Sequence, residues 1–262
     1  MWKKSRFARE GTIVQYFLET EESIAEGVTG FTHYGALHIV WLILTAVFFA
    51  VLCIAYRRCG QSARKKMRHV LAYSLLGNEL FKTVCLLLGG NWLPKYLPLH
   101  MCSINIFLIA LHAFRPGKFL GNYLYAVGIP TAVIAIIFPS WTALPLGNFM
   151  HLHSFTVHMC LAVYPLMVTL GGDIQPHPRY LLRCLGFAVA MAVPVYGVNL
   201  LLDTNFMFLM YAPEGNPLYW FQQTFGNHFI GFPVLIAAVV VVMYLPSVRQ
   251  LKERFGKKHA KV

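Results

Sequence analysis

The sequence predicts an all-α integral membrane protein built as a bundle of seven transmembrane helices. The 262-residue chain is 57% hydrophobic and only 12% charged, whereas a soluble domain is about half apolar and a quarter charged. Its mean hydropathy is +0.57. Apolar runs long enough to cross a bilayer, about 20 residues each, recur along the chain. The loops between these runs alternate between strongly basic and nearly uncharged sequences.

The apolar runs predict the position of each helix, and the first is ALHIVWLILTAVFFAVLCIAY. The seven predicted helices are 36–56, 69–89, 98–114, 119–139, 153–171, 181–201 and 226–246. Short loops join them, so we expect residues 31–248 to form one transmembrane domain. An N-terminal extracytoplasmic segment (1–30) precedes this domain, and a basic cytoplasmic tail (249–262) follows it.

The loop charges predict the orientation, because Lys and Arg near membrane spans are retained on the cytoplasmic side. The loop RRCGQSARKKMR after the first helix and the tail RQLKERFGKKHAKV are densely basic. The alternate loops, 90–97, 140–152 and 202–225, contain Lys95 as their only Lys or Arg. We therefore expect the N-terminus outside and the C-terminus in the cytoplasm of a multi-pass plasma membrane protein.

The net charge of +12 would suggest nucleic acid as the partner of a soluble protein. Here the basic residues flank membrane spans, so we expect them to contact anionic lipid headgroups and no nucleic acid. The six cysteines include no CxxC pair, and no disulfide framework is expected. No cofactor is expected either.

The N-terminal segment begins MWKKSRFAREG without a following apolar stretch, so no cleavable signal peptide is expected. Residues 10–30 place Ile13, Val14 and Phe17 opposite several glutamates. This pattern is typical of a short amphipathic helix at a membrane surface, and a tail without fixed structure is the alternative.

Polar residues inside the apolar runs predict the site, because a charge at bilayer depth costs about 2.5–3.5 kcal/mol on insertion scales. Glu79 lies near the middle of the second predicted helix, and Lys82 follows three residues later on the same face. Two interpretations stay open. The pair either locks helix packing, or it supplies a carboxylate that handles protons or orients a histidine.

Several histidines gather near the outer ends of the predicted helices. His38 begins the first helix, and His158 lies in the fifth, four residues after Ser154 and within hydrogen-bonding reach of it. In the third helix Ser103 shares a face with His100, whereas Cys102 sits about 200° around a regular helix from His100. Cys102 is therefore better explained as a core residue than as the partner of His100.

Asn199 closes the sixth predicted helix at the same outer end, and Asn205 follows just outside it. We expect these groups to line a polar cavity that is open to the outer leaflet, with Glu79 at its floor. No metal is expected, because His151 and His153 point apart on a helix. The predicted catalytic residues are His100, His158 and Glu79, and the predicted substrate-binding residues are His38, Cys102, Ser103, Asn199 and Asn205.

The ordered motifs resemble the YwaF-type bacterial integral membrane family, which is related to the eukaryotic transmembrane protein 164. The resemblance is carried by FTHYGALH, Glu79, LPLHMCS, FTVH and GVNLLLDTNFMFL, and it extends from Phe31 to Pro246. It implies a seven-helix bundle and, through the eukaryotic relatives, a phospholipid acyltransferase or transacylase.

In those relatives the cysteine held responsible directly precedes the histidine of the LPLHMCS motif. Here that position is Leu99, and the nearest cysteine is Cys102. If acyl transfer occurs, either Cys102 is the nucleophile, or His100 and His158 activate the acceptor directly.

Three functional hypotheses follow from the same cavity. The first is a lipid-handling enzyme acting on membrane phospholipid, in which His100 and His158 act as base and acid and Asn199 or a backbone donor stabilises the oxyanion. The second is a small-molecule transporter or receptor in which Glu79 and Lys82 form a coupling pair, although no inverted repeat is visible. The third is a structural or assembly protein whose buried polar groups only hold helices together.

Overall fold

Regular structure in the computed structural model is entirely helical within residues 16–259, the part of the chain whose backbone is described; side chains are described for residues 16–245. Seven helical segments in this part are long and apolar enough to cross a membrane. The predicted fold class, an all-α bundle with seven membrane-spanning helices, is therefore confirmed. Six of the spans contain α1 (Ala36–Arg58), α2 (Gln61–Leu88), α3 (Met101–Phe114), α6 (Phe149–Leu170), α7 (Leu181–Leu202) and α9 (Gly231–His259).

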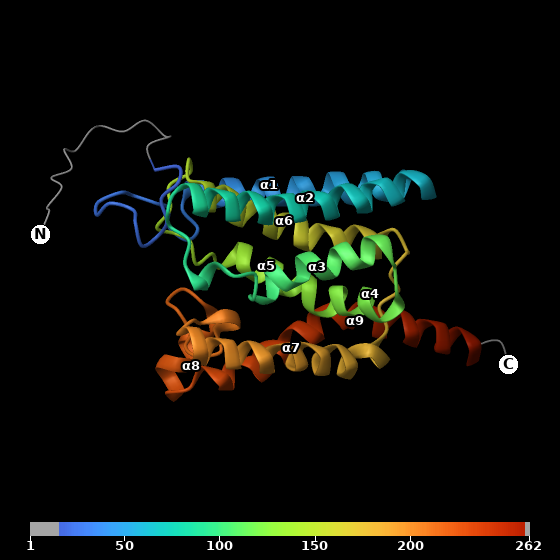
Figure 1. Ribbon diagram of the computed structural model, residues 1–262. Coiled ribbons are helices and arrows are strands. Elements are labelled where there is room, and N and C mark those ends of the chain that lie inside the picture. The colour runs from blue at the N-terminus through green and yellow to red at the C-terminus, as the bar shows by residue number, and fades with distance from the viewer. Residues whose placement is uncertain (1–15, 260–262) are drawn as a thin grey trace, which may run out of the picture.

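The spanning helices alternate in direction along the bundle (Figure 1). We call the end at which α1, α3 and α6 begin the histidine end, and the opposite end, where α2 and α7 begin, the arginine end. In Figure 1 the histidine end is on the left and the arginine end on the right. The loop charges predict that the histidine end faces outside, and this orientation stays a prediction.

The fourth span is a series of three segments, because it contains a proline. It consists of α4 (Lys118–Tyr123), the π-helical η2 (Leu124–Gly128) and α5 (Ile129–Ile137). Pro130 has no N–H to donate to the preceding turn, which widens the helix at this point. Next to it, Thr131 donates its hydroxyl to the carbonyl of Val127 at 2.8 Å.

Helix α6 is the centre of the fold and positions the site. It packs against α1, α2, α3 and α5, and α2 also packs against α3. By contrast, α7 and α9 bury few of their residues, as expected for helices that present apolar side chains to lipid. Figure 1 shows α1, α2 and α6 together, α3 to α5 beside them, and α7 to α9 on the far side.

Helix α2 is longer than the sequence predicted. The basic segment was expected to be a loop before a helix at 69–89, but only Cys59 and Gly60 separate α1 from α2, and residues 61–68 are helical. Arg, Lys and Met are good helix formers, and a loop of two residues is enough to reverse the chain.

The N-terminal segment also differs from the sequence-based expectation. Residues 16–35 form turns and bends and contain no helix, so an amphipathic helix is absent from the described part of segment 10–30. Residues 10–15 lie outside the described part. The segment is held by Asn148, whose side-chain amide donates to the carbonyls of Tyr16 (2.8 Å) and Glu19 (2.7 Å).

Short helices complete the connections. At the histidine end these are η1 (Pro94–Tyr96), η4 (Phe206–Phe208), α8 (Pro217–Phe225) and η5 (His228–Ile230), and η3 (Pro178–Tyr180) precedes α7 at the arginine end. The loop predicted at 202–225 is therefore partly helical, with η4 packed next to the start of α3.

Candidate functional site

A buried ion pair lies inside the membrane-spanning part of α2. Lys82 donates to Glu79 Oε1 at 2.5 Å, and the two residues are only 6% and 8% exposed. The second carboxylate oxygen, Glu79 Oε2, is buried and has no hydrogen-bond partner among the described residues. A buried carboxylate oxygen without a donor is costly, so this atom is a candidate contact for a bound ligand.

His158 of α6 lies at the same depth as this ion pair. Glu79 is nine residues before the end of α2 and His158 is nine residues after the start of α6, which places both about 13 Å from the histidine end. His158 Nδ1 is 2.6 Å from the carbonyl of Ser154. Because a carbonyl only accepts, Nδ1 is the donor, and Nε2 of the neutral ring carries a free lone pair. The predicted contact between Ser154 and His158 therefore forms through the Ser154 backbone.

His100 is held in the opposite tautomer. Its Nδ1 accepts from the backbone N–H of Met207 at 3.2 Å, so Nε2 of the neutral ring is the protonated nitrogen. The ring lies edge-on to Phe206, with the centroids 5.3 Å apart. His100 therefore offers a donor where His158 offers an acceptor.

His100 precedes α3 rather than lying within it. The third helix was predicted from residue 98, but α3 begins at Met101, and His100 is its extended N-cap residue (φ −66°, ψ 151°). The regular-helix angle predicted between His100 and Cys102 therefore does not apply. With 14 residues, α3 is about 21 Å long, which is shorter than the roughly 30 Å hydrocarbon core. Non-helical backbone at that depth is tolerated where it is buried in protein or lines a wet cavity.

The loop that contacts His100 contains three residues with unfavourable backbone angles. Asp203, Met207 and Phe208 have φ values of 50°, 58° and 55°, a left-handed conformation that is uncommon for residues other than glycine. Asn199 holds this loop, since its Oδ1 accepts from the N–H of Phe206 at 2.8 Å and its Nδ2 donates to the carbonyl of the same residue at 3.0 Å.

The two predicted asparagines both support this loop. Asn199 Oδ1 accepts a second hydrogen bond from the Thr204 hydroxyl at 3.0 Å. Asn205 accepts from the N–H of Met210 at 3.0 Å and donates to the carbonyl of Tyr211 at 2.9 Å. Their amides are occupied in this arrangement, and a role in binding substrate stays a prediction.

His38 is fully buried and uses both ring nitrogens. Nδ1 accepts from the N–H of Tyr34 at 2.9 Å, and Nε2 lies 2.8 Å from the carbonyl of Ile136. These bonds join the start of α1 to the end of α5. His38 therefore supports the helix ends that surround the site.

Cys102 and Ser103 lie on α3 beyond His100. Cys102 packs against the core and lies near the Thr131 hydroxyl and Tyr123. Among the described residues, no hydrogen bond joins its thiol to His100 or His158. Ser103 is partly buried and forms no side-chain hydrogen bond with a described residue.

Two further residues of the site were not among the sequence predictions. His153 of α6 is 7% exposed, and its Nδ1 lies 2.6 Å from Asn78 Oδ1 of α2. Trp141 stacks on the His158 ring, with the centroids 5.3 Å apart and the planes at 10°. Its buried indole N–H has no acceptor among the described residues. The signal for His153 was its place directly before Ser154 and five residues before His158 on the same helix. The signal for Trp141 was an indole in a loop at a membrane boundary.

The site is therefore assembled where α2, α3 and α6 pack together. His100 lies within electrostatic range of Lys82 and His158, and His153 lies within range of the same two groups. Among the described residues, no group of three or more His, Cys, Asp or Glu side chains is placed to hold a metal ion.

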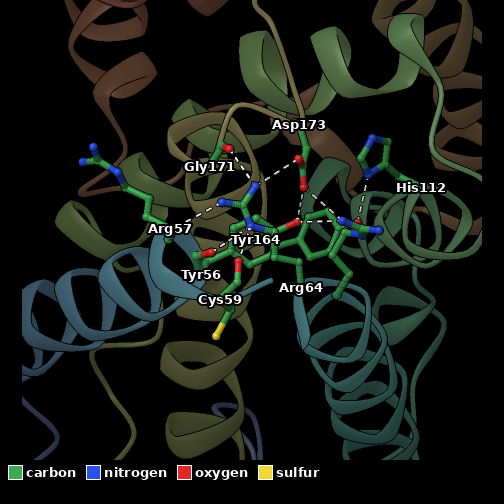
Figure 2. Close-up of polar contacts among 9 residues, drawn as sticks. Tyr56, Arg57, Cys59, Arg64, His112, Tyr164, Gly171 and Asp173 are labelled. Atoms are coloured by element: carbon green, nitrogen blue, oxygen red, sulfur yellow. Dashed lines mark hydrogen bonds and ion pairs between the residues drawn. The ribbon is translucent and has the colours of Figure 1, made fainter. Parts of the chain in front are cut away.

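A second cluster of polar side chains lies at the arginine end (Figure 2). Arg64 donates to the carbonyls of Tyr56 at 3.0 Å and Gly171 at 2.9 Å, at the ends of α1 and α6. Arg64 and Arg68 both pair with Asp173, at 3.3 Å and 3.1 Å. Because the last carbonyls of a helix have no partner within that helix, the cluster ties two helix ends to the start of α2.

An apolar layer separates the two polar clusters. It contains Leu75 of α2, Ile106 and Ile109 of α3, and Leu161 of α6, all at most 2% exposed. On the arginine side of this layer, His112 Nδ1 lies 2.9 Å from the Tyr164 hydroxyl. The histidine-lined site is thus closed at its floor by packed hydrocarbon side chains.

The fold and the site define a multi-pass membrane protein with a buried polar site in one half of its helix bundle. The chain belongs to the TMEM164 family, whose model matches residues 33–244. No curated protein and no solved structure matches the chain in the same comparisons. The finer assignment to the YwaF-type bacterial branch stays a prediction.

Proposed function

We propose that this protein is an intramembrane acyltransferase that moves an acyl chain from a phospholipid to the hydroxyl of a lysolipid. The observation that carries the proposal is the pair of histidines with opposite free nitrogens, the Nε2 lone pair of His158 and the Nε2–H of His100. Acyl transfer needs one base for the attacking hydroxyl and one donor for the ester carbonyl. The resemblance to the eukaryotic transmembrane protein 164 points to the same reaction class.

In the proposed reaction His158 removes the proton from the lysolipid hydroxyl, whose oxygen attacks the ester carbonyl carbon. The carbonyl oxygen becomes an oxyanion, and the Nε2–H of His100 donates to it. When the intermediate collapses, the bond to the original glycerol oxygen breaks. His158 returns its proton to that oxygen. One ester bond has formed, another has broken, and the proton has moved from the acceptor to the new lysolipid.

The buried ion pair supports this chemistry electrostatically. Lys82 lies within electrostatic range of His100 and His153, and in this proposal its positive charge stabilises the developing negative charge. Glu79 keeps Lys82 paired within the membrane. Charges held in place in a site of low dielectric constant stabilise a transition state more strongly than they would in water.

The placement of Cys102 favours direct transfer over an acyl-cysteine intermediate. Its thiol lies near Thr131 and Tyr123, and it forms no hydrogen bond with a histidine among the described residues. A thiol needs a neighbouring base or positive charge to become a reactive thiolate. In this proposal Cys102 therefore packs against the core, and the two histidines act on the lipid substrates.

The apolar layer below the site favours an enzyme over a transporter. A transport path from the histidine end to the arginine end would have to pass Leu75, Ile109 and Leu161, which are at most 2% exposed. A closed floor is compatible with a substrate that enters and leaves in the plane of the membrane.

The proposal is tested by acyl transfer in reconstituted vesicles. Phospholipid with a labelled acyl chain and an unlabelled lysolipid are the substrates for the wild type, His158→Asn and Cys102→Ser. We expect His158→Asn to lose at least about a hundredfold in rate, as is typical for removal of a general base, and Cys102→Ser to keep most of it. Loss of activity only in Cys102→Ser would favour an acyl-cysteine mechanism. Absence of transfer by the wild type would reject the proposed function.

A further inference from the structure

The basic residues of the arginine end fall into two sets with different surroundings. Arg64 and Arg68 both pair with Asp173, and their side chains are only 15% and 13% exposed; Figure 2 shows Arg64 turned toward Asp173. Lys65 and Lys66 lie between them in sequence and are exposed. Residues four apart share a face of a helix, whereas the intervening positions point elsewhere. The two arginines therefore hold the fold, and the lysines are left free.

The positive charge at this end exceeds what its acidic residues can balance. Asp173 is the only Asp or Glu at this end whose side chain the structure describes, and it already pairs with two arginines. Eight exposed basic residues at this end pair with no described carboxylate: Arg57, Arg58, Lys65, Lys66, Arg115, Lys118, Arg179 and Arg183. They come from the ends of α1 and α3, the starts of α2, α4 and α7, and η3.

The length of α2 places its lysines at the level of lipid headgroups. The helix has 28 residues and is about 42 Å long, whereas the hydrocarbon core is about 30 Å thick. If the apolar part from residue 69 onward crosses that core, residues 61–68 extend about 12 Å beyond it. Lys65 and Lys66 then stand where phosphate groups lie.

We propose that the arginine end binds the phosphate headgroups of anionic phospholipids, with Lys65 and Lys66 as the central contacts and Arg57 and Arg58 beside them. Charge complementarity selects this partner, because the surface is strongly positive and its own carboxylate is already paired. A lipid rather than a soluble phosphate is the expected source, because this surface adjoins the apolar sides of α1 and α2, and lipid there brings its phosphate to the same level. The inference does not depend on the proposed function.

The experiment measures binding of fluorescently labelled phosphatidylglycerol to the purified full-length protein in neutral detergent micelles, with labelled phosphatidylcholine in parallel. Each Lys near an anionic surface contributes about 1 kcal/mol, or about fivefold in affinity. We therefore expect Lys65→Gln to weaken phosphatidylglycerol binding about fivefold, and the double variant with Lys66→Gln about 25-fold. Binding should also weaken as salt is added.

Lys95→Gln is the matched control, since it removes one lysine at the histidine end, where Lys95 pairs with Glu22. We expect it to bind like the wild type. Melting temperatures of the Lys65 and Lys66 variants should equal that of the wild type, because neither side chain forms a described salt bridge. Equal binding of the two lipids, unchanged binding by the double variant, or full displacement by millimolar inorganic phosphate would each overturn the inference.

Discussion

The ion pair of α2 allows a prediction that separates its structural role from its catalytic role. Lys82→Met removes one charge and leaves the Glu79 carboxylate, 8% exposed, about 13 Å from the end of the helix. A lone charge at that depth costs about 2.5–3.5 kcal/mol, and breaking a buried pair costs about 3–5 kcal/mol. We therefore expect Lys82→Met to lower the free energy of unfolding by about 3 kcal/mol.

The double variant Lys82→Met with Glu79→Gln leaves no charge at this depth. It should therefore recover most of the stability, ending within about 1 kcal/mol of the wild type, because replacing a buried pair with neutral groups is often nearly neutral. Unfolding in mixed detergent, followed by circular dichroism, is measured for the wild type, Lys82→Met, Glu79→Gln and the double variant, which completes the double-mutant cycle. If the losses from the single variants simply added in the double variant, the two side chains would not be coupled and the reasoning would be wrong. A double variant that is stable yet inactive would show that the pair also serves the reaction.

Three further changes test the packing that supports the site, each measured by thermal unfolding in detergent. Asp173→Asn should lower the free energy of unfolding by about 2 kcal/mol, because Arg64 and Arg68 lose the charged acceptor they share. An unchanged melting temperature would contradict the role assigned to this cluster. Asn148→Ala removes the N-cap of α6 and should lower the free energy of unfolding by about 1 kcal/mol. Unchanged stability would argue against this capping role. Gly171→Ala would place a Cβ 2.6 Å from the Tyr56 ring, so this variant should be less stable than the wild type. An equally stable variant would show that the ring can move aside.

Hydropathy was sufficient to predict the bundle, because each span must satisfy its backbone within a helix. The predicted and observed helices differ where local chemistry, rather than hydropathy, sets the helix boundary. Asn148 caps α6 through the N–H of Met150 at 2.8 Å and starts that helix four residues before the predicted residue 153. Pro130 widens the fourth span, and the basic segment before residue 69 is helical although it is polar.

The histidines of the site were visible in the sequence, but their roles were not. Whether a ring nitrogen is free depends on backbone atoms that are distant in sequence, such as the N–H of Met207 for His100 and the carbonyl of Ile136 for His38. Trp141 illustrates the same limit, because only the tertiary fold stacks this loop residue on His158.

Acyl transfer between lipids at the histidine end can be followed directly with two isotopic labels. The protein is reconstituted with a phospholipid carrying a ¹³C-labelled acyl chain and a lysolipid carrying a deuterated headgroup, and mass spectrometry follows the products. We expect the wild type to produce a phospholipid that contains both labels, and His158→Asn to lose this product. Labelled free fatty acid without the doubly labelled lipid would indicate hydrolysis, and an equal yield from both proteins would contradict the role of His158.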